Sequence, residues 1–172
     1  MKRYEIGDYL MHESAGVCQV KKIEMLALRG RGSDKEYYEL EPVYQSGGQV
    51  ITPVDDQNGR LRDIKTEDEM QSLLENVAKI DSLDTRNNRE FQDTVKSIIA
   101  DFDPKALASV VKTVYVRKKT RIESGKKAMS QDERFLQLAG KKLFDEMAFV
   151  LNQSHEVIEQ SFFTKIDNAM SK

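Results

Sequence analysis

The sequence predicts an α+β protein of two modules. A small, strongly bent β-sheet or barrel is expected over residues 1–58, and a compact all-α bundle of about five helices over residues 59–172. Three observations indicate this division. Short apolar runs separated by glycine turns fill the first part of the chain, and from about residue 60 the apolar residues take helical spacing. A concentrated basic segment lies only in the second part.

Four or five short strands are expected in the first module. Each apolar run is bounded by turn residues, and the two glycines of the segment 29–33 permit the positive φ that a hairpin tip requires. Short strands at this spacing are typical of a small bent sheet or barrel. Residues 54–64 are the expected linker. The expected strands are 9–11, 17–28, 37–40 and 49–52.

The second module contains four helix-start signals. Thr66 with Glu69, and Ser130 with Glu133, have the spacing of a capping box. Asp103 before a proline and Ser154 before an apolar run are also typical of N-caps. The apolar faces expected from helical spacing are Met70, Leu73, Leu74 and Val77; Phe91, Val95, Ile98, Ile99 and Phe102; Leu107, Val110, Val111 and Val114; Phe135, Leu138, Leu143, Met147, Val150 and Leu151; and Val157, Ile158, Phe162 and Ile166.

Several functional classes lack support in the sequence. No apolar run approaches the roughly 18 residues of a membrane span, and no secretory signal opens the chain, so a cytoplasmic protein is expected. Cys18 is the single cysteine, which excludes an internal disulfide. His12 and His155 fall in different modules, and no carboxylate cluster suits a metal. We therefore expect no enzyme, metal or cofactor; a small nucleic-acid-processing hydrolase is the enzymatic alternative.

Positive charge is concentrated in one part of the chain. The formal net charge is -2, but residues 85–140 carry 12 basic and 7 acidic side chains, a local charge of +5. Residues 117–127, called the basic segment below, contain six basic residues opposed by Glu123 alone. Phosphate binding responds to such a local field rather than to the overall charge. The alternative is a solvated helix end, at which cations complement the helix dipole.

The expected nucleic-acid surface draws on two helices. Antiparallel packing would bring the start of the helix that carries Arg86 and Arg89 near the end of the next helix, which carries the basic segment. Scattered cations of this kind suit contact with the DNA backbone or minor groove rather than base readout. Asn87 could approach base edges, although helix capping is the favoured role for the Asn87-Asn88 pair. The expected DNA-contacting residues are Arg86, Asn87, Arg89, Arg117, Lys118, Lys119 and Arg121.

A pattern of turn glycines and apolar strands covers residues 4–11, 15–20, 23–24, 35–40 and 50–54. Together with the helix order and the basic segment, this pattern resembles the CarD/CdnL family of bacterial transcription regulators. The resemblance implies a Tudor-like domain that binds the β subunit of RNA polymerase, and a helical domain that contacts promoter DNA at the edge of the transcription bubble. The implied partners are therefore polymerase and DNA, without a membrane, and we expect a monomer.

Two departures from the family pattern bear on mechanism. Better-known members place a tryptophan wedge where this chain has Asn87, and the chain contains no tryptophan. Basic residues that grip polymerase in some members are replaced by Leu26 and Ile51, so strand pairing and apolar contact at Leu26, Ala27, Leu28 and Ile51 are expected to supply that interface. The implied mechanism is a shift of the closed–open equilibrium of the promoter complex. The alternative is a polymerase-binding adaptor whose helical module recruits a protein.

Overall fold

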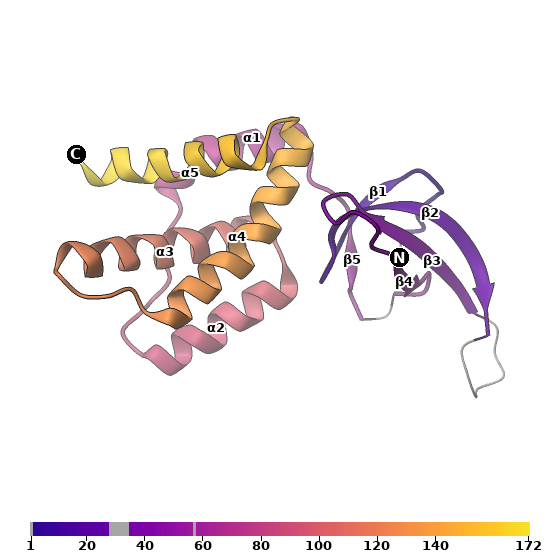
Figure 1. Ribbon diagram of the computed structural model, residues 1–172, viewed down its shortest axis with the longest axis horizontal. Helices are drawn as coiled ribbons and strands as arrows, with labels where there is room; N and C mark the ends of the chain where they lie inside the picture. Colours follow the sequence, from indigo (N-terminus) through magenta and orange to yellow (C-terminus); the bar gives the residue numbers. More distant parts are fainter. Residues whose placement is uncertain (1, 28–34, 57) are drawn as a thin grey trace. The chain divides into compact units, whose positions relative to one another are not determined.

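The computed structural model describes residues 2–27, 35–56 and 58–172, and these divide into two compact units at the boundary between Ile64 and Lys65. A five-stranded antiparallel sheet forms the first unit, and five α-helices form the second (Figure 1). The α+β class and the two-module organisation predicted from the sequence are therefore confirmed.

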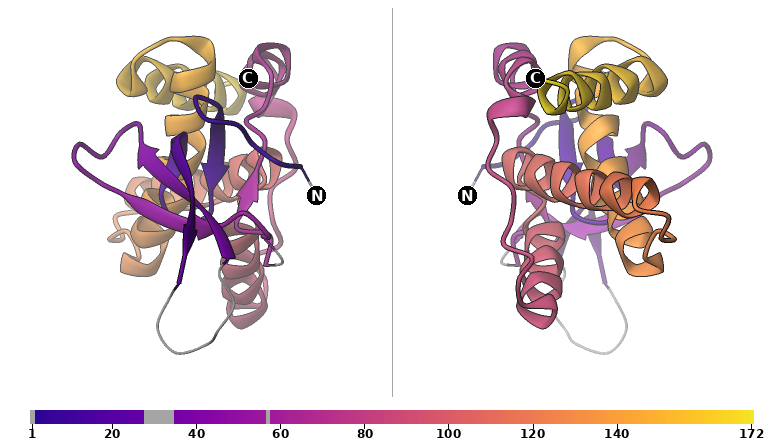
Figure 2. Two further views of the ribbon diagram at one scale, coloured as in Figure 1. Left: turned by 90° about the vertical axis from the view of Figure 1, so that its right-hand side faces the viewer. Right: turned by 90° about the vertical axis from the view of Figure 1, so that its left-hand side faces the viewer.

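The sheet of the first unit has the strand order β4-β3-β2-β1-β5. Every described pairing is antiparallel, and the register shifts between Val20 and Lys22 of β2, where a bulge bends the strand. The sheet is strongly twisted, as the left-hand view of Figure 2 shows. The strands are β1 (Tyr9–His12), β2 (Gly16–Leu26), β3 (Lys35–Pro42), β4 (Val50–Pro53) and β5 (Leu61–Arg62).

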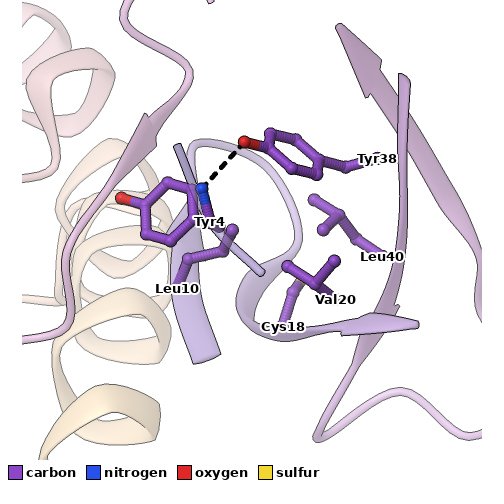
Figure 3. Close-up of a cluster of buried hydrophobic side chains, with 6 residues drawn as sticks. All are labelled: Tyr4, Leu10, Cys18, Val20, Tyr38 and Leu40. Atoms are coloured by element: carbon purple, nitrogen blue, oxygen red, sulfur yellow. Dashed lines mark hydrogen bonds between the residues drawn. The ribbon is translucent and has the colours of Figure 1, made fainter. Parts of the chain in front are cut away.

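One face of the bent sheet encloses a small hydrophobic core. Tyr38 and Leu40 of β3 are fully buried against Leu10, Cys18 and Val20 (Figure 3). The Tyr38 hydroxyl accepts a hydrogen bond of 2.9 Å from the backbone N–H of Tyr4, whose ring packs edge-on against it. Cys18 is thus a core residue, and burial raises the pKa of its thiol to about 12.

The end of the first unit differs from the sequence prediction. We expected the β-rich module to stop at residue 58 and residues 54–64 to act as linker, but Leu61 and Arg62 form β5 and pair with β1. The Asp56 carboxylate accepts hydrogen bonds from the backbone N–H groups of Arg60 and Leu61, which fixes the turn before this strand. Two-residue strands have no periodicity to detect. The expected hairpin tip at 29–33 lies outside the described residues.

Five helices and one short 3-10 turn make up the second unit. All of its residues, 65–172, are described. Helix α2 ends at Phe102, which takes a left-handed conformation (φ 45°) and so reverses the chain directly into α3. The elements are α1 (Glu67–Glu75), η1 (Val77–Lys79), α2 (Asn88–Asp101), α3 (Pro104–Glu123), α4 (Ser130–Leu151) and α5 (His155–Met170).

Three of the four predicted helix starts are confirmed. Thr66 and Glu69 form a complete capping box, Asp103 caps α3 ahead of its N1 proline, and the Ser154 hydroxyl accepts the N–H of Val157. The capping box predicted at Ser130 is wrong. Met129 occupies the N-cap position of α4 and makes no side-chain cap, so Ser130 is already the first helical residue.

The helical core follows the predicted faces with two clear exceptions. Leu107, Val110, Val111 and Val114 of α3 are all fully buried, whereas α4 buries three of its six predicted residues and α5 three of its four. Leu138 and Val157, however, are about half exposed, at 43% and 51%. Each lies at the margin of its helical face, where spacing alone does not say how far the neighbouring helix reaches. Among the described residues no helix has the length and apolarity to cross a bilayer.

Candidate functional site

Of the residues predicted to bind polymerase, Ile51 lies on the exposed face of the sheet. Ile51 of β4 is 50% exposed and stands in register with Glu39 and Lys22 on the neighbouring strands. Leu26 ends β2 and is half-buried, and Ala27 follows it as an exposed residue. Leu28 lies outside the described residues. The structure therefore brings an isoleucine and an ionic row to one surface.

Strand β4 and the later part of β2 each have an edge that pairs with no strand among the described residues of the sheet. Strand β4 is terminal in the sheet and pairs only with β3. Strand β1 reaches only as far as Gln19, so the part of β2 from Lys22 to Leu26 pairs with β3 alone. Unpaired backbone N–H and C=O groups along such an edge are a template for an added strand.

Arg86, Asn87 and Arg89 lie at the start of α2, and two of them have local partners. The exposed Arg86 guanidinium donates to Asp84 at 2.7 Å, and this hydrogen bond holds the pKa of that carboxyl down at about 2. The Asn87 side chain caps α2 by accepting the backbone N–H groups of Arg89 and Glu90, which confirms the favoured role of this residue. The Arg89 side chain is exposed and has no ion pair among the described residues.

Arg117 is held inside the helical unit. Its guanidinium makes a two-pronged contact with the carboxylate of Asp132 on α4, including an Nε–Oδ2 distance of 2.6 Å, and lies over the Phe91 ring of α2 at 4.3 Å. Only 20% of the Arg117 side chain and 1% of the Asp132 side chain are exposed. The end of α3 and the starts of α2 and α4 meet here (Figure 1), so the predicted juxtaposition of these helix ends is confirmed.

The neighbouring lysines also face acidic residues. Lys118 lies 3.3 Å from a carboxylate oxygen of Glu133 on α4. Lys119 donates to Asp167 on α5 at 2.8 Å, and the Tyr115 hydroxyl donates to the same carboxylate. These hydrogen bonds lower the pKa of Asp167, that from Lys119 having the larger effect.

Arg121 closes the end of α3. Its Nε donates to the backbone carbonyl of Lys127 at 3.0 Å, across the turn at Gly125. Gly125 has a φ of 78°, a conformation that favours glycine and permits Lys126 N–H to bond back to the Arg121 carbonyl. Much of the basic segment is thus engaged in fixing helix ends to one another.

A second pair of cations, not singled out by the sequence pattern, lies between α2 and α4. Lys96 of α2 and Arg134 of α4 line one cavity of about 350 Å³, whose floor includes the buried Phe135. Both side chains are exposed, and neither makes an ion pair with a described residue. Both residues contribute to the local positive charge of residues 85–140. Because neither has a basic neighbour in the sequence, a search for runs of basic residues misses them.

A more apolar groove lies on another side of the helical unit. Tyr115 of α3 and Phe163 of α5 stack at 4.3 Å and line a cavity of about 420 Å³ together with Leu136 and the half-exposed Ile122. Lys118 and Lys119 stand at its rim. This groove offers apolar contact with few polar groups.

The two histidines belong to different units, and each has contacts within its own unit. His12 is buried and contacts Thr52 through Nε2 at 3.1 Å, with Nδ1 accepting the N–H of Ala15. His155 contacts Asp145 and Glu159 within the helical unit. No group of three His, Cys, Asp or Glu side chains suited to a metal occurs within the described ranges.

Comparison with known proteins identifies the first unit. Residues 4–65 match the family described as CarD-like/TRCF RID domain. No curated protein matches the chain. The matched range covers the sheet from Tyr4 through β5, so it coincides with the first structural unit rather than with the shorter module expected from the sequence. Domains of this family are non-enzymatic modules that interact with RNA polymerase. The resemblance seen in the sequence is thus confirmed over this range, and residues 4–65 form a CarD-like/TRCF RID domain.

Proposed function

We propose that this protein binds the β subunit of RNA polymerase through its first unit and contacts promoter DNA through its helical unit, so that it alters the stability of the open complex. The observation that carries the proposal is the CarD-like/TRCF RID domain at residues 4–65, with its unpaired strand edges. Strand addition would supply affinity through main-chain hydrogen bonds. The exposed Ile51 on β4 would supply apolar contact beside that edge.

Tethering gives weak DNA contact a function. A helical unit held at polymerase experiences a high effective concentration of promoter DNA, so contacts that are weak in free solution act where polymerase already sits. A difference in affinity between the closed and open promoter shifts their equilibrium by that difference and no more. Whether a promoter is activated or repressed then depends on which step limits its initiation.

The polymerase contact is tested by capture of RNA polymerase β subunit on the immobilised full chain and on two matched variants. Ile51→Glu places a charge on β4, whereas Val157→Glu places the same charge at an equally exposed apolar position of α5. We expect Ile51→Glu to lose most of the capture and Val157→Glu to retain it. Equal capture by both variants would exclude this face of β4, and no capture by the unmodified chain would refute the polymerase contact.

A second candidate function is favoured by the internal pairing of the basic segment. Arg117, Lys118 and Lys119 all face acidic residues of the helical unit, and an apolar groove lies beside them. In this alternative the helical unit recruits a protein to polymerase instead of contacting DNA. Retention on polymerase–promoter complexes that is insensitive to salt, and that charge reversal at Lys118 and Lys119 and at Lys96 and Arg134 leaves unchanged, would favour it.

A further inference from the structure

We infer that the groove between α2 and α4, with Lys96 and Arg134 on its two walls, is the site at which the helical unit binds the phosphodiester backbone of duplex DNA. The inference rests on the proposed function and replaces the basic segment as the main phosphate contact. It starts from a difference in ion pairing between two groups of basic residues. The cations at 117–119 face carboxylates, whereas Lys96 and Arg134 have none within 4 Å among the described residues.

The acidic residues nearest the groove are either paired with other cations or absent from its lining. In the first turn of α4, Asp132 is bound by Arg117 and Glu133 by Lys118, so both contact α3. On α2, Asp93 lies one turn before Lys96, but it does not line the groove and forms no ion pair with Lys96 or Arg134 in the described structure. The groove is therefore lined by two cations without an ion-pair partner among the described residues, a condition that suits an anionic ligand.

The groove is built for a sugar–phosphate chain rather than for a lone ion. The cations line a cavity of about 350 Å³ together with Gln131, an amide donor, and with Ile99 and Leu138 as apolar contacts. Leu138 is 43% exposed, although the sequence predicted that it lies on the apolar, core-facing side of its helix. Charged walls with an apolar strip between them match a backbone in which phosphates alternate with apolar sugar faces.

Arg89 extends the same row along α2. It lies seven residues before Lys96, hence about two turns and roughly 10 Å along the same helical face. One strand of duplex DNA presents a phosphate every 3.4 Å or so along its axis, so this spacing corresponds to about three nucleotides. Helices α2 and α4 both begin at the end of the unit where α3 finishes (Figure 1), so Arg89, in the first turn of α2, lies at the same end of the unit as the first turn of α4. A periodic backbone, rather than an acidic peptide, is the occupant that this regular spacing favours.

The test uses the full chain and a fluorescein-labelled duplex of about 20 base pairs, with anisotropy measured across a salt series. In Lys96→Gln/Arg134→Gln we expect about tenfold weaker binding at low salt, and a log–log salt slope reduced by about 2, because each lost phosphate contact removes roughly one released counterion. The matched control, Lys118→Gln/Lys119→Gln, removes two charges from the basic segment and is expected to change affinity less than twofold. Lys96→Arg/Arg134→Lys should restore binding, and thermal unfolding verifies that each variant is folded.

Three results would overturn the inference. Unchanged binding in Lys96→Gln/Arg134→Gln with weakened binding in the control would place the phosphates at the basic segment and leave the proposed function intact. No duplex binding by the unmodified chain, free or on polymerase, would remove the DNA half of the proposed function as well. An oligoglutamate that binds more tightly than the duplex, and that the groove variant no longer binds, would make an acidic protein the occupant.

Discussion

At the scale of single residues, the helical unit shows that a basic run in a sequence does not by itself give a basic surface. Arg117, Lys118 and Lys119 are consecutive, yet they reach Asp132, Glu133 and Asp167 on two other helices. The sequence predicted the positive charge of this segment correctly. It could not predict the partners, because the Lys119–Asp167 contact joins residues 48 positions apart and depends on how α3 and α5 pack.

Arg117 provides the sharpest prediction at this scale. Arg117→Met should lower the free energy of unfolding by about 3–5 kcal/mol, because it leaves the Asp132 carboxylate buried without its partner. Arg117→Met/Asp132→Leu should recover much of that loss. Urea unfolding measures both, with Arg134→Met as a control that removes an exposed arginine and should change stability by less than about 0.5 kcal/mol. If Arg117→Met lowered the free energy of unfolding by less than about 0.5 kcal/mol, the ion pair would have no structural role.

The Lys119–Asp167 pair predicts a pH dependence. The hydrogen bond from Lys119 lowers the pKa of Asp167 below its ordinary value of 3.8. A carboxyl with a depressed folded-state pKa contributes stability that is fully present above 3.8 and is lost as the pH falls through the lower folded-state value. Thermal unfolding between pH 5 and 2 should therefore show a smaller acid-induced loss in Asp167→Asn than in the unmodified chain. Lys119→Met should have the same effect, and combining the two should add nothing; additive effects would contradict the pairing.

At the scale of elements, helix starts were predictable wherever the capping side chain and the backbone N–H group that donates to it lie within one turn. Thr66, Asp103, Ser154 and Asn87 satisfy backbone N–H groups two or three residues away, so the signal is local. The Ser130–Glu133 pair has the same spacing but no cap, because α4 begins after Met129. The short strand β5 was missed because its pairing with β1 joins residues about 50 positions apart.

These two starts form a matched experiment. Thr66→Ala removes the hydroxyl that accepts the Glu69 backbone N–H and donates to the Glu69 carboxylate, and it should lower the free energy of unfolding by about 1 kcal/mol. Ser130→Ala changes the same kind of sequence signature at a position without a cap and should cost less than about 0.5 kcal/mol. Chemical denaturation of the two variants checks the difference. Equal losses would mean that Ser130 caps α4 after all.

At the scale of the whole molecule, the two units carry separable halves of the proposed function. The first is recognisable from its sequence because turn glycines, apolar strands and core residues such as Tyr38 and Leu40 are specified locally, and its family match covers 4–65. The second is recognisable as a bundle, but its phosphate groove is assembled from Lys96 and Arg134, single cations on different helices. From the sequence, the type of domain could therefore be predicted for the first unit. For the second unit, the sequence predicted a helical bundle and its positive charge, but not the residues that form the groove.

The central claim is that polymerase binding by one unit makes DNA contact by the other effective. It is tested most directly by the half-life of heparin-challenged RNA polymerase–promoter complexes with the unmodified chain, with Ile51→Glu and with Lys96→Gln/Arg134→Gln. The account predicts that the unmodified chain changes the half-life and that either variant abolishes the change. An effect that persists undiminished in Ile51→Glu, while the groove variant abolishes it, would show that the DNA contact acts without this polymerase contact and would contradict the account.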